Sequence, residues 1–334
     1  MSQKLKVELV VCTHNPNLDF LQRTVDGLKA QTLSQDQWGF LLVDNGSKVT
    51  VDPAYANWHQ NGRIVVEPEL GLTSARICGI RNTQSELIVF VDDDNVLAPD
   101  YVKQVLNIAQ QNPKLGAFGA AKILPEFEVE PDNDCRPFIQ SLALRDQDYA
   151  LWSNDPEDRT NPWGAGLIVQ RDVAIEFARI ATEDPLRKLL GRKGNSLNSA
   201  EDIEFAWIAC EMGLSKGVFP ELQMKHLIDA RRVDRNYLLR LIEGHAFSHT
   251  LMKYIHHADI LKRASRLNRQ PNDEIWTSPQ SSIVSIAKHC VVWLFAKTPP
   301  LKHSFFNCAR LATYNGNSKG YQLIDKIEAE STKS

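Results

Sequence analysis

The fold is decided by one run of the sequence, Leu87-Ile88-Val89-Phe90-Val91-Asp92-Asp93-Asp94, in which five apolar residues end abruptly in three carboxylates. An uninterrupted apolar run of this length is typical of a strand buried on both faces, as in parallel sheets. Adjacent carboxylates repel one another, and a divalent cation removes that penalty. The run therefore predicts a buried strand with a metal site at its end. A solvated acidic turn is the alternative.

Further strands and helices are predicted on both sides of this run. The other apolar runs of strand length are Val7–Cys12, Phe40–Asp44, Arg63–Glu67, Gly116–Leu124 and Gly166–Gln170. Helical patterns occur at Leu18–Gln31, Thr73–Gln84, Pro99–Gln111, Ala200–Glu211 and in a stretch that reaches Ala181. Strands that alternate with helices favour right-handed crossovers. We therefore predict an α/β fold with a mostly parallel, Rossmann-like central sheet flanked by helices.

The charge of the chain is unevenly distributed. The 334 residues carry a net charge of −3, which argues against binding to nucleic acid through overall charge. Yet 17 of the 38 basic residues, and only 9 of the 41 acidic ones, lie from Lys225 onward. Most of that part has a helical pattern. We therefore predict a domain at 1–224 and a basic, mainly helical region at 225–334.

The basic region also contains an apolar stripe, formed by Ile283, Ile286, Ala287, Cys290 and Leu294. Basic residues interleaved with Trp and Phe suit the surface of an anionic membrane. Such stripes also pack against a protein core. The region is thus predicted to face the acceptor or a membrane, with core packing as the alternative.

Several classes of protein lack their usual signals in this sequence. The six cysteines form no CxxC pair, which argues against a zinc ribbon or redox motif. The first apolar run is too short for a signal peptide, and no run of about 18 apolar residues occurs. We predict a cytoplasmic protein, with peripheral contact at the inner face of the membrane as an open alternative.

Polar side chains follow three of the predicted strands. Thr13 and Asn15 come after the first strand, Asp44 after the second, and the three aspartates after the fourth. In open parallel sheets, ligands bind at these carboxyl ends. Arg76 lies on the first turns of a helix whose N-terminus attracts anions. The sequence therefore predicts one polar crevice for an anionic ligand.

Two later segments complete the candidate site. Trp163 and Gly164 precede the predicted strand at Gly166–Gln170, where a Trp ring can stack on a sugar and a glycine allows close approach. Glu201 and Asp202 begin a helix, so either could serve as a general base. The structural alternatives are a tight turn with a core Trp, and acidic residues that favour a helix N-terminus.

In this order the segments resemble the family 2 glycosyltransferases, whose fold is called GT-A. The resemblance covers roughly Lys6 to His226. It is carried by Val10-Val11-Cys12-Thr13-His14-Asn15, Leu42-Val43-Asp44-Asn45-Gly46-Ser47, Ala75-Arg76 with Gly79 and Asn82, Phe90-Val91-Asp92-Asp93-Asp94, Trp163-Gly164-Ala165-Gly166 and Glu201-Asp202-Ile203-Glu204. The Gln-x-x-Arg-Trp motif of the processive synthases is absent, which argues against a processive polysaccharide synthase.

The resemblance implies a role for each candidate residue. Mn²⁺ or Mg²⁺ would be held by Asp94 and His226, with Arg231 nearby. The catalytic base would be Asp202. The acceptor side would comprise Trp163, Gly164 and Glu201. The nucleotide-sugar would be bound by Thr13, Asn15, Asp44, Arg76, Asp92 and Asp93.

The implied function is inverting, metal-dependent transfer of a sugar from a nucleoside-diphosphate sugar, with UDP favoured, to a hydroxyl of a glycan or lipid-linked acceptor. Such a reaction belongs to polysaccharide or cell-surface glycan biosynthesis. A non-catalytic protein that binds sugar-nucleotides or glycans is one alternative. A nucleotidyltransferase is another, although Cys12-Thr13-His14-Asn15-Pro16 stands where that class carries a glycine-rich phosphate loop.

Overall fold

The computed structural model of the protein describes residues 5–266 and 305–331. They form two compact units. The first comprises 1–130, 142–195 and 201–232, and the second comprises 131–141, 196–200 and 233–334. The apolar stripe that begins at Ile283 lies outside the described residues. In the described part of the chain, no helix is long and apolar enough to cross a membrane.

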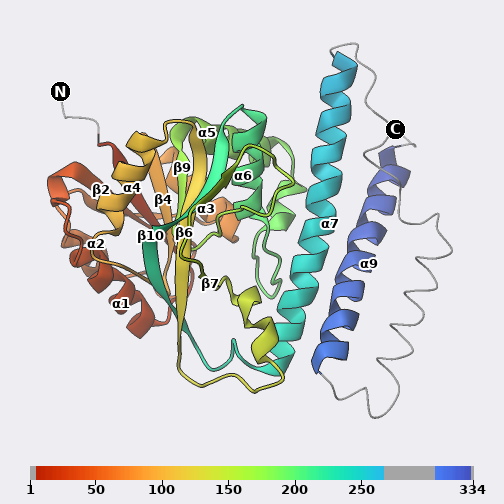
Figure 1. Ribbon diagram of the computed structural model, residues 1–334, viewed down its shortest axis with the longest axis horizontal. Helices are drawn as coiled ribbons and strands as arrows, with labels where there is room; N and C mark the ends of the chain where they lie inside the picture. The colour runs from red at the N-terminus through yellow and green to blue at the C-terminus, as the bar shows by residue number, and fades with distance from the viewer. Residues whose placement is uncertain (1–4, 267–304, 332–334) are drawn as a thin grey trace. The chain divides into compact units, whose positions relative to one another are not determined.

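The first unit is built on one sheet with the order β3-β2-β1-β4-β9-β6-β10-β5 (Figure 1). Four neighbouring strands, all parallel, are β3 (Gly62–Val66), β2 (Trp38–Asp44), β1 (Val7–Thr13) and β4 (Leu87–Asp92). The remaining strands of this order are β9 (Leu167–Gln170), β6 (Leu115–Phe127), β10 (Ser215–Ile228) and β5 (Asn95–Leu97). Two short strands, β7 (Arg145–Asp146) and β8 (Leu151–Ser153), pair with β6 and β10.

The predicted α/β class with a helical C-terminal region is confirmed, and the sheet itself is mixed. Strand β9 runs antiparallel to both β4 and β6, whereas β6 and β10 are parallel to each other. Parallel pairing therefore dominates only on the β3 side of the sheet. Sequence patterns show where strands lie but not their direction, which is why the reversal at β9 was not predicted.

Strand β10 is the main element that the sequence analysis missed, and the predicted boundary at 224/225 falls inside it. An irregularity between Phe219 and Gln223, next to Pro220, divides the strand into two short stretches. The second stretch alternates buried and exposed residues, so it lacks a continuous apolar run. The change from the first unit to the second comes after Arg232.

The helices of the first unit pack on the sheet through an aromatic core. They are α1 (Leu18–Lys29), α2 (Ala54–Asn57), α3 (Leu72–Arg81), α4 (Tyr101–Gln111), α5 (Arg171–Glu183) and α6 (Glu201–Glu211), with 3₁₀ turns η1 (Gln35–Gln37) and η3 (Arg187–Leu190). The 3₁₀ turn η2 (Arg136–Leu142) belongs almost entirely to the second unit. Phe205 of α6 stacks on Phe177 of α5 at 3.8 Å between ring centroids and contacts Phe90 of β4 at 5.6 Å. This core fixes the start of α6 relative to the end of β4.

The second unit contains two long helices that run side by side in the same direction (Figure 1), α7 (Arg235–Arg266) and α9 (Phe305–Ser331). The Arg235 guanidinium lies 5.1 Å from the Phe305 ring near the start of both helices. About three to four helical turns farther, Thr250 donates a hydrogen bond to Asn317. A Cβ at Gly316 would overlap the backbone of α7, so this glycine allows the helices to approach closely.

Candidate active site

The carboxyl ends of three parallel strands bring the predicted residues together. The backbone register pairs Thr13 with Asp44 and Cys12 with Asp92. The ends of β1, β2 and β4 therefore lie at one edge of the sheet. The sequence analysis placed the nucleotide-sugar at this edge.

Asp44 and Asn15 are engaged by the loop that follows β2. Asp44 is buried, and its two oxygens accept hydrogen bonds from the backbone N–H groups of Ser47 and Val51, at 3.0 and 3.1 Å. Asn15 has a left-handed backbone, with φ of 48°, and its Oδ1 accepts a hydrogen bond from Lys48 N at 2.8 Å. Both side chains thus shape the loop around the crevice.

The three aspartates have different environments. Asp93 accepts a hydrogen bond from the hydroxyl of Thr13. Desolvation, together with the negative charge of Asp94, raises the pKa of Asp93 to about 7. Desolvation also acts on Asp94, but its interactions with His226 and Arg232 hold the pKa of Asp94 below its usual range. At neutral pH Asp94 is therefore more firmly ionised than Asp93.

Asp94 and His226 fit a divalent cation. Atom Nε2 of buried His226 lies 3.4 Å from Oδ2 of Asp94, a separation expected of two atoms that bind one ion at about 2.1 Å each. Among the described residues no group of three His, Cys, Asp or Glu side chains surrounds one point. The protein would thus supply two ligands and leave the other positions to water and phosphate oxygens, as Mg²⁺ sites often do.

Arg232 places a positively charged side chain next to Asp94 and His226, and the sequence analysis did not identify it. Its Nη1 lies 2.5 Å from Asp94 Oδ2 and 2.9 Å from His226 Nε2. Arg231, which the resemblance placed here, is 86% exposed and pairs with Asp229. Arg232 and a metal ion would compete for the same carboxylate oxygen.

Arg76 links the aspartates to the start of α6. This arginine is buried, with Nη1 3.1 Å from Glu201 Oε1 and Nη2 3.7 Å from Asp92 Oδ1. Burial raises the pKa of Glu201 to about 7, although the charge of Arg76 acts to lower it. Arg76 therefore connects donor-side and acceptor-side carboxylates beneath the surface of the crevice.

Gly164 gives Asp202 its position. The backbone N–H of Gly164 donates to Asp202 Oδ2 at 2.8 Å, and its carbonyl faces Arg76 Nη2 at 3.5 Å. A Cβ at this position would lie 2.6 Å from Arg76 Nη2, so only glycine allows the approach. The chain Asp92–Arg76–Gly164–Asp202 thus joins the end of β4 to the candidate base.

Two further arginines belong to the site and were not found from the sequence. Arg145 of β7 lies with its guanidinium 5.0 Å from the ring of Trp163. Arg192, in the loop before α6, lowers the pKa of Asp94 and of Glu201 through its charge. Neither lies in a motif, and the tertiary fold alone brings them to the crevice.

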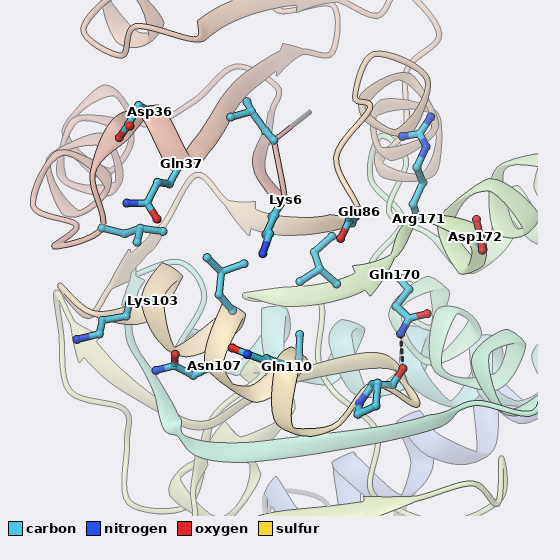
Figure 2. A pocket seen from close by; sticks show the side chains of 16 residues that line it. Lys6, Asp36, Gln37, Glu86, Lys103, Asn107, Gln110, Gln170, Arg171 and Asp172 are labelled. Atoms are coloured by element: carbon cyan, nitrogen blue, oxygen red, sulfur yellow. Dashed lines mark hydrogen bonds between the residues drawn. The ribbon is translucent and has the colours of Figure 1, made fainter. Parts of the chain in front are cut away.

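A cleft of about 1180 Å³ lies at the opposite edge of the sheet from the candidate site (Figure 2). Lys6, Gln37 and Glu86 stand just before β1, β2 and β4, and Lys103 and Asn107 of α4 line the other side. None of the candidate site residues lines this cleft. Since ligands of such sheets bind at the carboxyl edge, this cleft is not the candidate site.

The comparisons with known proteins concern part of this chain. The family model described as "Glycosyl transferase family 2" matches residues 8–141. The glucosyl-dolichyl phosphate glucuronosyltransferase of Haloferax volcanii is 21% identical over 195 residues, which is 57% of this chain and 59% of that protein. A putative glycosyltransferase of Bacillus subtilis, EpsH, is 27% identical over 106 residues, or 31% of this chain and 30% of that protein. The chain thus covers less than two thirds of either relative.

Among solved structures, the mannosyltransferase PcManGT from Pyrobaculum calidifontis, in complex with GDP-Man and Mn²⁺, is 16% identical with a TM-score of 0.49. That comparison covers 96% of this chain and 88% of the other. Through residues 8–141 the chain is similar to the family 2 glycosyltransferases.

Proposed function

We propose that this protein is an inverting, metal-dependent glycosyltransferase. It would move a sugar from a nucleoside-diphosphate sugar, with UDP as the favoured nucleotide, to a hydroxyl of a glycan or lipid-linked acceptor in cell-surface glycan synthesis. The observation that carries the proposal is the connection through Arg76, which joins Asp92 at the donor edge to Glu201 beside Asp202.

The donor half of the crevice would bind the nucleotide. Thr13, Asn15 and Asp44 would lie along the base and ribose, with Asp92 and Asp93 next to the ribose and diphosphate. Asp94 and His226 would hold Mn²⁺ or Mg²⁺, whose charge would stabilise the departing nucleoside diphosphate. The guanidinium groups of Arg76 and Arg232, which contact Asp92 and Asp94, would add positive charge on the same side.

Asp202 would act as the general base. Its carboxylate would accept the proton of the acceptor hydroxyl while that oxygen forms a bond to the anomeric carbon and the bond to the diphosphate breaks. The hydrogen bond from Gly164 fixes the carboxylate before the acceptor arrives, which lowers the entropic cost of alignment. Attack from the face opposite the leaving group inverts the anomeric centre.

A lipid-linked acceptor has support from one relative. The Haloferax volcanii protein is named for a glucosyl-dolichyl phosphate acceptor. The cytoplasmic location and the peripheral membrane contact stay predictions. A non-catalytic binding protein is the alternative, and the presence of both Asp94 and Asp202 in one crevice favours the enzyme.

The test is a panel of nucleotide sugars incubated with the purified protein and Mn²⁺, with release of nucleoside diphosphate as the readout. We expect one donor to be turned over, slowly by water and faster with a glycan or lipid-phosphate acceptor. Anomeric configuration of the product, read by NMR, reports inversion. Binding of donors with no release under any condition would favour the non-catalytic alternative.

A further inference from the structure

Arg145 is a positively charged group with no ion-pair partner among the residues that the structure describes. Its Nη2 donates to the carbonyl of Asn161 at 2.9 Å, and its Nη1 donates to the carbonyl of Ala120 at 3.4 Å. A guanidinium has five N–H donors in a planar fork. Both bonds go to neutral carbonyls, so the charge of Arg145 is not balanced by a direct contact.

The neighbours of Arg145 hold it rigidly. Its guanidinium lies 5.0 Å from the centroid of the Trp163 ring. Asn161, whose carbonyl it contacts, is itself fixed by Lys216, whose Nζ donates to Asn161 Oδ1 at 2.7 Å. Lys216 is fully buried and also binds the carbonyls of Pro156 and Asp158. Buried Lys216 thus holds the loop whose carbonyl at Asn161 binds Arg145.

The electrostatic surroundings of Arg145 point to the acceptor side. Burial lowers the pKa of Arg145 to about 10, so the group stays charged at neutral pH. Asp202 is the acidic group whose charge opposes this shift, although it makes no direct ion pair with Arg145. Trp163 precedes Gly164, which binds Asp202. A fixed cation therefore stands near the candidate base.

We propose that Arg145 and Trp163 form a subsite for an anionic group, a phosphate or a carboxylate, carried by the acceptor. A partly desolvated cation without a counter-charge is costly, and an anion that binds there removes that cost. The guanidinium fork matches both anions, and the Trp face suits the sugar next to them. The proposal rests on the proposed function only in calling the ligand an acceptor.

The test is an NMR titration of the full chain, labelled with ¹⁵N at tryptophan. The Trp163 indole signal is assigned by its absence in Trp163→Phe. The probes are methyl phosphate, acetate and methyl glucoside. We expect a saturable shift with at least one anion and none with the neutral glucoside. Methyl phosphate alone would indicate a phosphate-linked acceptor, and acetate alone an acidic sugar.

Substitutions make the test specific. Arg145→Gln should weaken anion binding about tenfold or more, and Arg145→Lys, which keeps the charge but not the fork, should weaken it less. Arg179→Gln, at an exposed position of α5, is the matched control and should bind like wild type. If Arg145→Gln does not fold, the lysine variant and the wild-type titration still decide the matter.

Two results would overturn the proposal: no shift of Trp163 with either anion, or equal shifts in wild type and Arg145→Gln. The far-UV circular dichroism spectrum of Arg145→Gln, measured in parallel, should match that of wild type, so that a loss of anion binding is not mistaken for a loss of the fold. Failure of the proposed function would appear as no donor turnover at all, a result independent of the anion titration.

Discussion

The donor half and the acceptor half of the crevice are built in different ways. On the donor half, Thr13, Asp44 and Asp92 are positioned by the register of parallel strands. On the acceptor half, Arg145 and Trp163 are held by side-chain bonds to loop carbonyls and by ring contacts. The family model matches residues 8–141, which include Thr13, Asp44 and the three aspartates and end before Arg145.

This difference suggests how such an enzyme changes acceptor. Backbone pairing tolerates few changes, because moving one strand end moves its neighbours. Loops carry function and tolerate variation when a rigid scaffold supports them. Substitutions at 145–164 should therefore change the acceptor without loss of the donor. The following predictions test this separation, beginning with the largest effect.

Removal of the Asp94 carboxylate should abolish donor chemistry. We expect Asp94→Ala to lower nucleoside diphosphate release by about 10³-fold or more at saturating Mn²⁺, because its charge and metal ligation are lost together. Asp172→Ala, on the exposed start of α5 at the opposite edge, is the control and should retain wild-type release. Full turnover by wild type in EDTA would contradict the metal requirement.

Asp202→Asn should distinguish the two halves of the site most clearly, because it should affect sugar transfer but not donor binding. Asparagine keeps an acceptor for the Gly164 N–H but cannot take the acceptor proton. Transfer should fall by about 10²–10⁴ while the affinity for the nucleotide sugar stays within twofold to threefold. The measurements are initial rates and donor titration by calorimetry. A transfer rate within a few-fold of wild type would move the base to Glu201 or Glu204.

Glu201→Gln tests the link between the halves. It removes the closer of the two carboxylates that contact buried Arg76, leaving Asp92 at 3.7 Å, and loss of one partner of a buried pair costs about 3–5 kcal/mol. We expect the free energy of unfolding to fall by about 3 kcal/mol, since glutamine still accepts a hydrogen bond. The matched control is Glu176→Gln, which breaks an exposed pair with Arg179 and should cost under about 1 kcal/mol. Equal losses of unfolding free energy in urea titrations would show that the buried ion pair stabilises the protein no more than the exposed one.

The smallest effect is expected at Arg232, within the donor half. If Arg232 competes with the metal for Asp94, Arg232→Gln should bind Mn²⁺ about fivefold more tightly, which corresponds to about 1 kcal/mol. Arg231→Gln removes the same charge from the exposed neighbour and should change little. Calorimetry with Mn²⁺ alone measures both. Weaker binding in Arg232→Gln would mean that this arginine orients Asp94 for the metal.

The sequence predicted the donor half better than the acceptor half, for physical reasons. In the sequence, a buried strand and its polar end appear as an abrupt change from apolar to polar residues, as between Val91 and Asp92. A two-residue strand such as β7 is too short to show an alternation of apolar and polar residues. The sequence therefore contained no sign that Arg145 lies near the site. The choice between Arg231 and Arg232 depends on a turn in which Arg232 N bonds to the Asp229 carbonyl, and this turn directs Arg232 toward Asp94.

Arg76 has a consequence for the order in which substrates bind. The Arg76 guanidinium contacts both Asp92 and Glu201. Any contact that a donor makes with Asp92 should therefore change the strength of the ion pair between Arg76 and Glu201. Glu201 precedes Asp202, and the orientation of the base should therefore depend on whether the donor is bound. We expect compulsory-order kinetics, with the donor first and the acceptor second. The apparent KM for the acceptor should accordingly fall as the donor concentration rises.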